Sequence, residues 1–189
     1  ANTPPMNYFG FYGGLPMRRF NVRQLIFCAL FAALIAVFSQ VSLAIGPVPI
    51  SLATLAVMLC GLLLGERMGC LAVLCYLLLG LVGAPVFSGL RGGASALMGA
   101  TGGYLIGYLP YAALAGLGGK KGGLGRRFLF LLLGTAACYL LGTLWFMRQS
   151  GNSLAASLSL CVFPFLPGDA VKILLAAFLT PRLKKALRF

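Results

Sequence analysis

Two ionisable side chains, Asp169 and Lys172, lie three residues apart inside the apolar stretch of residues 166–175. The sequence holds only two acidic and fifteen basic residues in 189, so an acid and a base this close together in an apolar run are unusual. A charge at the centre of a membrane helix costs about 2.5 to 3.5 kcal/mol on insertion scales, and it is kept where it is paired, hydrated or used. Lys172 can bind an anion such as a carboxylate, and Asp169 can accept hydrogen bonds from N–H groups.

A structural role fits the same spacing equally well. Asp169 could cap the helix that begins near it and pair with Lys172 at i, i+3, an interaction that stabilises an exposed helix by only a few tenths of a kcal/mol. Spacing alone leaves a binding site and a structural ion pair evenly balanced.

The composition is that of an integral membrane protein. Hydrophobic residues make up 60% of the chain and charged residues 9%, and the mean hydropathy is +0.98. The net charge of +13 does not indicate nucleic-acid binding, because the basic residues form short clusters between long uncharged runs. The chain has no histidine, and its six cysteines have no C-x-x-C spacing, so we expect buried packing thiols and no metal site, disulfide framework or other cofactor.

Long uncharged runs, interrupted by glycine and proline residues that end helices, predict an all-α fold with six transmembrane helices. Residues 24–65 carry no charge and are too many for one span of about 20 residues, and a Gly-Pro turn at residues 46–49 divides them. A tight turn is predicted at residues 65–67 and a basic connector at residues 118–127. The first five predicted helices cover residues 22–45, 50–64, 68–82, 101–117 and 128–147.

Two segments are predicted to be irregular. Five of the eleven residues in 83–93 are Gly or Pro, which favours a pocket lid over an ordinary interfacial loop after the third helix. The sixth helix is broken by Pro164 and Pro167, and its second half, residues 169–180, makes only about 18 Å of helix against about 30 Å of hydrocarbon. A half-helix that starts below the outer surface would place Asp169 and Lys172 inside the protein, as discontinuous helices do in transporters.

The distribution of basic residues predicts the orientation. Six spans put both termini on one face, which receives twelve of the fifteen Lys and Arg residues; the other face receives Arg91 and Arg148, and Lys172 lies in the membrane. The positive-inside rule makes the first face cytoplasmic. We therefore expect a multi-pass protein of the cytoplasmic membrane, with its irregular segments facing outward where a solute would enter.

Six motifs, in order through residues 22–183, match one known family. They are Pro-Val-Pro-Ile-Ser-Leu (47–52), Gly-Leu-Leu-Leu-Gly (61–65), Tyr-Leu-Leu-Leu-Gly (76–80), Gly-Ala-Pro-Val-Phe-Ser-Gly (83–89), Gly-Ala-Thr-Gly-Gly-Tyr (99–104) and Pro-Phe-Leu-Pro-Gly-Asp-Ala-Val-Lys (164–172). Together they resemble the BioY family, the biotin-binding S components of energy-coupling factor (ECF) transporters. The chain departs from the family at Ala100, where Pro is usual, and at Ala53, where a polar residue is common.

The resemblance implies a six-helix bundle that captures biotin for uptake, in a pocket closed by the loops after helices 1 and 3. It implies that Asp169 and Lys172 contact biotin directly. Further residues lie in motifs that line or close the pocket: Ser88, Gly89, Gly93, Thr101, Gly102 and Tyr104. Lys172 on the carboxylate with Asp169 on the ureido ring is the preferred arrangement, and Lys172 on the ureido oxygen is the alternative.

The resemblance also implies partners. The first helix carries two A-x-x-x-A pairs, Ala29 with Ala33 and Ala32 with Ala36, which match the family's docking surface for a transmembrane coupling protein driven by two ATPase subunits. The chain has no G-x-x-x-x-G-K-[ST] loop, so ATP hydrolysis is expected on those separate subunits and the chain itself is not expected to be an enzyme.

Two rival functions fit the residues less well. A proton-coupled secondary transporter could use Asp169 as its proton carrier, but no second membrane acid or histidine supplies a relay. A membrane enzyme lacks a recognisable nucleophile and base. Residues 17–189 are expected to form one substrate-binding membrane domain, and residues 1–16 are an unassigned N-terminal extension or cloning remnant.

Overall fold

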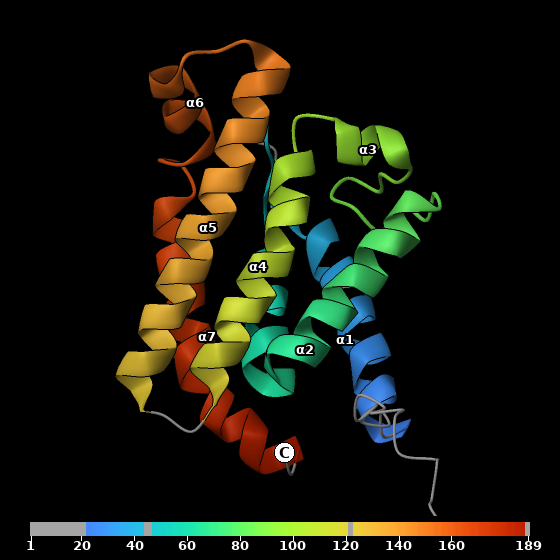
Figure 1. Ribbon diagram of the computed structural model, residues 1–189, viewed down its shortest axis with the longest axis vertical. Coiled ribbons are helices and arrows are strands. Elements are labelled where there is room, and N and C mark those ends of the chain that lie inside the picture. Colours follow the sequence, from blue (N-terminus) through green and yellow to red (C-terminus); the bar gives the residue numbers. More distant parts are fainter. Residues whose placement is uncertain (1–21, 44–46, 121–122, 188–189) are drawn as a thin grey trace, which may run out of the picture.

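The computed structural model describes residues 22–43, 47–120 and 123–187, so residues 1–16 and part of the Gly-Pro turn lie outside the described residues. The described part is helical apart from one short strand pair, and seven helices are present (Figure 1). The elements are α1 (Val22–Gln40), β1 (Ser42–Leu43), β2 (Ile50–Ser51), α2 (Ala53–Leu81), α3 (Ala94–Met98), α4 (Gly102–Gly119), α5 (Leu124–Ser150), α6 (Leu154–Cys161) and α7 (Leu166–Leu187).

The end of α1 corrects one prediction. A helix was expected through residue 45, but α1 ends at Gln40, and β1 pairs antiparallel with β2 across the Gly-Pro turn. The Leu52 N–H also donates to the Val41 carbonyl at 3.0 Å. Each backbone polar group needs one partner. Pairing across the turn therefore replaces the last helical turn, and α2 begins at residue 53 instead of 50.

The predicted turn at residues 65–67 is confirmed as a break inside α2. Gly65 has φ +83° and ψ 175°, a non-helical conformation that glycine adopts readily, so α2 consists of two helical segments joined at this residue. The break packs closely on α4, because a Cβ on Gly116 would lie 2.2 Å from the Glu66 nitrogen. Glu66 also forms an ion pair with Lys120 at 2.7 Å.

Helices α4 and α5 approach closely through glycines, as the spacing of Gly103 and Gly107 predicts. A Cβ on Gly103 would lie 2.2 Å from the Trp145 Cβ, and one on Gly107 would lie 3.0 Å from the Cys138 sulfur. Small residues at such positions let helix backbones come together in a membrane. The close contact brings side chains of both helices to one cavity.

Three described helices are long and apolar enough to cross a membrane: α1, α2 and α5. Helices α6 and α7 meet at 54° across a short break, and together they make a fourth candidate. Pro164 lies in that break. Pro167 lies in the first turn of α7, where proline is tolerated because its missing N–H has no helical partner.

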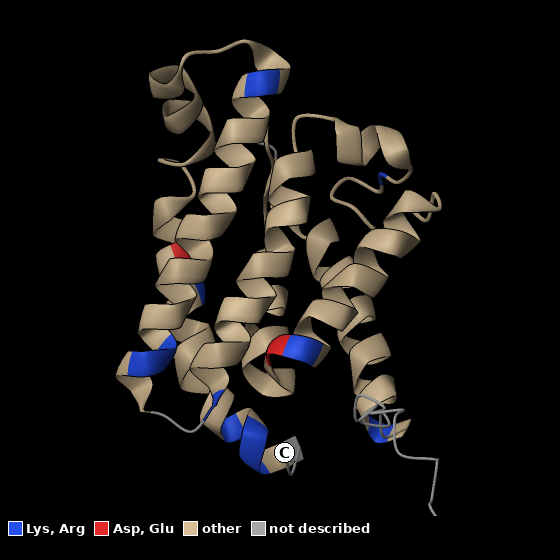
Figure 2. Ribbon diagram, viewed as in Figure 1, with Lys and Arg blue, Asp and Glu red and all other residues tan. Residues whose placement is uncertain are grey.

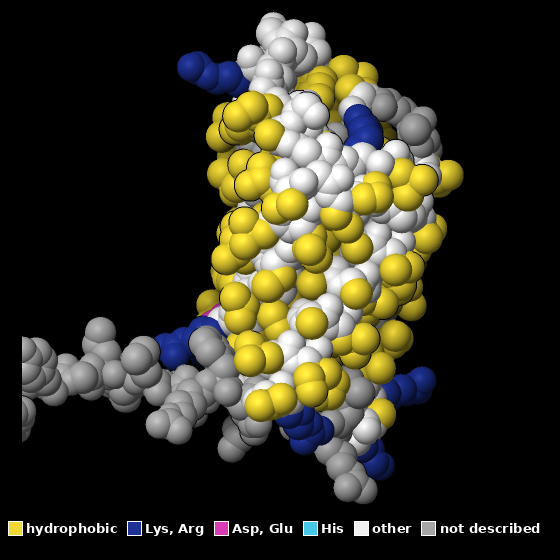
Figure 3. All heavy atoms as spheres, turned by 90° about the vertical axis from the view of Figure 1, so that its right-hand side faces the viewer, with side chains coloured by type: hydrophobic (Ala, Val, Ile, Leu, Met, Phe, Trp, Pro, Cys, Tyr) yellow, Lys and Arg dark blue, Asp and Glu magenta, His cyan; other side chains and the backbone are white. Residues whose placement is uncertain are grey.

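The surface has the form of a membrane protein. Apolar side chains cover the middle of the face in Figure 3, and Lys and Arg gather at its two ends. Figure 2 shows most of the described basic residues at the end of the molecule that holds the C terminus, whereas an acidic and a basic residue of α7 lie near mid-height. The charge asymmetry predicted from the sequence is therefore present in the folded chain.

Candidate functional site

A pocket opens among the β1–β2 turn, the loop after α2, and helices α2, α4, α5 and α7, with about 710 Å³ of empty space including its mouth. Six of its nineteen lining residues are aromatic, and five more are Ser or Thr. The lining residues are Val48, Pro49, Ser51, Thr54, Phe87, Ser88, Arg91, Ala96, Thr101, Tyr104, Leu105, Tyr108, Tyr111, Thr135, Cys138, Tyr139, Phe165, Asp169 and Lys172.

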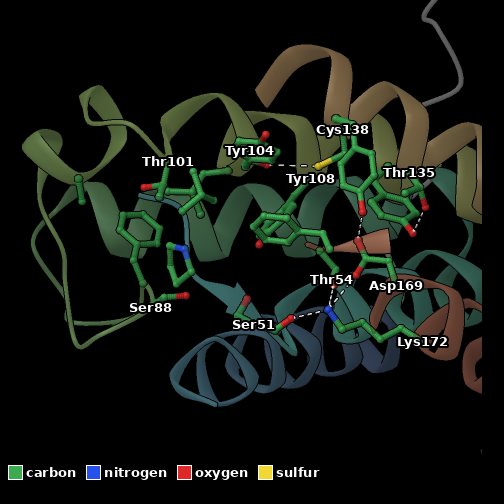
Figure 4. Close-up of a pocket in the computed structure, with 18 of the residues that line it drawn as sticks. Ser51, Thr54, Ser88, Thr101, Tyr104, Tyr108, Thr135, Cys138, Asp169 and Lys172 are labelled. Carbon is green, nitrogen blue, oxygen red and sulfur yellow. Dashed lines mark hydrogen bonds and ion pairs between the residues drawn. The ribbon is translucent and has the colours of Figure 1, made fainter. Parts of the chain in front are cut away.

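Asp169 and Lys172 form a buried ion pair at one end of this pocket. Their residues are only 4% and 6% exposed, and the Lys172 Nζ lies 2.8 Å from the Asp169 Oδ1 (Figure 4). Lys172 also donates to the Ser51 carbonyl at 2.8 Å and to the Thr54 hydroxyl at 3.0 Å. An ammonium has three N–H donors, so every donor of Lys172 has a partner within the protein.

The carboxylate of Asp169 is held from two sides. Lys172 binds Oδ1, and the Tyr139 hydroxyl of α5 donates to Oδ2 at 2.6 Å. Each carboxylate oxygen can accept more than one hydrogen bond. Asp169 therefore keeps acceptor capacity for a ligand, whereas the donors of Lys172 are occupied.

The local fold explains why these groups meet. Residues 41–43 and 50–52 pair across the turn, and α2 begins directly afterwards at Ala53, so the Ser51 carbonyl and the Thr54 hydroxyl lie side by side. Asp169 and Lys172 lie in the first turns of α7, one helical turn apart on the same face.

Tyrosine rings form the apolar walls. The Tyr104 ring stacks on Phe165 with centroids 6.4 Å apart, and its hydroxyl donates to the Cys161 carbonyl at 3.2 Å. The Tyr111 hydroxyl bonds to Thr135 at 2.7 Å. Because these hydroxyls already have partners, the rings offer the pocket flat apolar surface suited to a ring-containing ligand.

The other end of the pocket is formed by a tight hairpin in the loop after α2. Phe87 and Arg91 are antiparallel bridge partners, and Ser88 and Arg91 both line the pocket. Figure 4 shows Ser88 and Thr101 at the opposite end from Asp169 and Lys172. Arg91 is exposed, and its Nε donates to the Ser88 carbonyl at 3.2 Å.

Five of the eight substrate-binding residues suggested by the family resemblance line this pocket: Asp169, Lys172, Ser88, Thr101 and Tyr104. The other three are glycines that shape the backbone beside it. Gly89 and Gly93 have φ of +75° and +87°, and a Cβ on Gly102 would lie 1.7 Å from the Leu97 carbonyl oxygen.

The four alanines of α1 do not share one surface. Ala32 is 3% exposed and lies in the core, and Ala36 is half-buried against that core, whereas Ala29 and Ala33 are exposed. A partner surface on α1 stays a prediction, and on this geometry it would present Ala29 and Ala33, because a side chain packed in the bundle offers no area to another protein.

Several pocket residues were not found from the sequence. Thr135 and Tyr139 lie four residues apart on one face of the apolar middle part of α5, a polar spacing that could have marked them. Arg91 was assigned only to the outer face, although a lone basic residue in a Gly-rich loop is itself a signal. No sequence feature distinguished Tyr108 and Tyr111 as pocket residues, because buried tyrosines are also common in ordinary cores.

A hydroxyl-lined aromatic pocket with a buried ion pair, inside an apolar helical bundle, defines a membrane protein that binds a small, partly polar molecule. The BioY family model matches residues 16–189, and the chain belongs to the BioY family. This confirms the resemblance seen in the motifs.

Individual relatives and a solved structure agree with this family assignment. The chain is 40% identical over 164 residues to the probable biotin transporter BioY of Pyrococcus horikoshii, covering 87% of this chain and 98% of that one. It is 38% identical over 165 residues to the biotin transporter BioY of Thermotoga maritima, covering 87% and 97%. Its fold matches the crystal structure of the S-component for biotin from an ECF-type ABC transporter, with a TM-score of 0.77 and 32% identity, over 87% of this chain and 92% of that chain.

Proposed function

We propose that this protein captures biotin at the outer face of the cytoplasmic membrane, as the substrate-binding S component of an ECF-type ABC transporter. The observation that carries the proposal is the pocket itself, which has aromatic walls between a buried hydrogen-bonding pair and an exposed arginine. Biotin has the matching shape: a compact bicyclic ring with a ureido group at one end, and an apolar chain ending in a carboxylate at the other.

The occupied donors of Lys172 favour one binding direction. The ureido group has two N–H donors, which suit the remaining acceptor capacity of Asp169, whereas a ligand carboxylate at Lys172 would meet occupied donors beside the like-charged Asp169. Arg91 is exposed, and its terminal nitrogens have no acceptor in the described part of the chain, so its guanidinium is available to a carboxylate. We therefore place the ureido ring at the Asp169–Lys172 end and the carboxylate at Arg91, which keeps Asp169 on the ureido ring, as preferred from the sequence, and moves the carboxylate away from Lys172.

The topology completes the proposal. The six spans would be α1, the two segments of α2, α4, α5, and α6 with α7, which places both termini in the cytoplasm under the charge distribution. ATP hydrolysis would occur on separate subunits.

Biotin titration tests this function. Purified protein should bind biotin in a 1:1 ratio without ATP or a pH gradient. Trp145, the single tryptophan, donates to the Gly99 carbonyl at 2.9 Å beside the pocket-lining Thr101, so its fluorescence can report binding alongside calorimetry. Absence of binding by both methods would overturn the proposal, and binding only with a proton gradient would favour the secondary transporter.

The partner surface makes a separate prediction. Ala33→Leu adds bulk on the exposed side of α1, where close helix approach to a coupling protein needs small residues. Co-purification with the coupling complex should fall by about tenfold or more. A bulky side chain at a tightly packed interface position should cost at least about 1.4 kcal/mol of binding free energy, which corresponds to a tenfold loss of affinity. Biotin affinity should not change, because Ala33 is not a pocket residue.

Ala136→Leu is the matched control, since Ala136 is an exposed alanine on α5. Its co-purification should equal that of the unaltered protein. Loss of biotin affinity in Ala33→Leu, or unchanged co-purification, would show that this face of α1 is not the docking surface.

A further inference from the structure

Gln40, the last residue of α1, holds the hairpin that forms the Arg91 end of the pocket. Its Nε2 donates to the Phe87 carbonyl at 3.2 Å, and its Oε1 accepts from the Leu90 N–H at 3.0 Å. One amide side chain thus bonds a backbone acceptor on one side of the turn and a backbone donor on the other. The adjacent Ser39 hydroxyl also donates to the Val86 carbonyl.

The turn that Gln40 holds is unfavourable by itself. Leu90 has φ +55° and is the single non-glycine residue with positive φ among the described residues. This conformation costs about 1 to 2 kcal/mol for an L-residue with a Cβ. The Leu90 side chain is 70% exposed, so its burial offsets little of that cost. Backbone hydrogen bonds must therefore keep the turn in place, and the bond from the Leu90 N–H to Gln40 is one of them.

The base of the hairpin is anchored separately. Phe87 is 3% exposed, and its ring packs edge-on against Tyr76 with centroids 5.5 Å apart. It fills the space above Gly80, where a Cβ would lie 2.0 Å from the ring. Phe87 and Arg91 exchange two backbone hydrogen bonds, at 2.9 and 3.2 Å. The base should stay folded when Gln40 is changed, so the effect of Gln40 is on the turn and on the direction of Arg91.

Gln40 does not line the pocket, whereas Ser88 and Arg91 do. We propose that Gln40 is a positioning residue for ligand binding: by bonding Phe87 and Leu90 it fixes the 87–91 hairpin so that Arg91 is aimed at the ligand carboxylate. The proposal rests on the proposed function and extends it, because it assigns a role in recognition to a residue outside the pocket.

The test uses Gln40→Met, which keeps the length of the side chain and removes both hydrogen-bonding groups. Biotin affinity should fall about tenfold, the effect of losing roughly one well-placed hydrogen bond to a charged group, and biotin should dissociate faster. Biotin methyl ester has no carboxylate, so its affinity should change by less than about twofold. Val37→Met, on the exposed side of α1, is the control and should leave both affinities unchanged.

A second comparison separates positioning from general loosening of the fold. If Gln40 acts through Arg91, the double variant Gln40→Met/Arg91→Gln should bind biotin no more weakly than Arg91→Gln alone, since coupled residues are non-additive. Hydrogen exchange of the unliganded protein should show faster exchange at the Leu90 amide, with α4 and α5 unchanged.

Equal losses for biotin and its methyl ester, additive effects in the double variant, or unchanged Leu90 exchange would each overturn the role of Gln40. Failure of the proposed function looks different, because the unaltered protein would then not bind biotin at all.

Discussion

Lys172→Met should reduce biotin affinity by at least about 100-fold, which corresponds to losing a charged hydrogen bond and disordering Asp169. The substitution leaves the Asp169 carboxylate buried without its cation, and an uncompensated buried charge costs about 3 to 5 kcal/mol. The protein should therefore also melt at a lower temperature in detergent. Calorimetry and a thermal shift assay measure the two effects.

The double variant Asp169→Asn/Lys172→Met separates stability from binding. It removes both charges, so most of the lost thermal stability should return, whereas biotin affinity should stay low because the acceptor for the ureido N–H groups is changed. Since Lys172 lies at the ureido end, Lys172→Met should weaken biotin and biotin methyl ester equally. A selective loss for biotin would place the carboxylate at Lys172 instead, and restored binding in the double variant would make the pair purely structural.

Arg91→Gln should weaken biotin binding by about 10- to 100-fold, the range for a hydrogen bond between charged groups. Glutamine keeps a donor and much of the length but removes the charge. Biotin methyl ester should bind the variant and the unaltered protein alike, because its ester carries no charge for Arg91 to pair with. Titrations of both ligands into both proteins measure the difference.

Arg148→Gln provides the control for overall charge, since Arg148 is the other basic residue predicted on the outer face and does not line the pocket. It should bind biotin normally. If Arg91→Gln and Arg148→Gln weaken binding to the same small extent, Arg91 contributes only to the general attraction of an anion.

The sequence predicted helix breaks well where the break depends on the type of a single residue. Gly65 breaks α2 where a positive φ is needed, and Pro164 lies in the break before α7. The ends of α1 and α2 were misplaced because their backbone groups bond across the turn to residues about ten positions away. The short helix α3 was missed, since its five residues lie in a stretch where Gly and Pro favour a loop.

Asp169 and Lys172 were identified as a pair from the sequence alone, because a charge in an apolar run must be satisfied or used, whatever the fold. Which donors remain free was decided only by tertiary structure. Lys172 bonds to the Ser51 carbonyl, 121 residues away, and among the described residues that line the pocket this leaves Arg91 as the available cation. The same holds for α1, where packing in the core of the bundle buries Ala32 and leaves Ala33 exposed. Residue type and spacing set the chemistry that the chain can do, and the contacts between distant segments set which of those groups a ligand or a partner can reach.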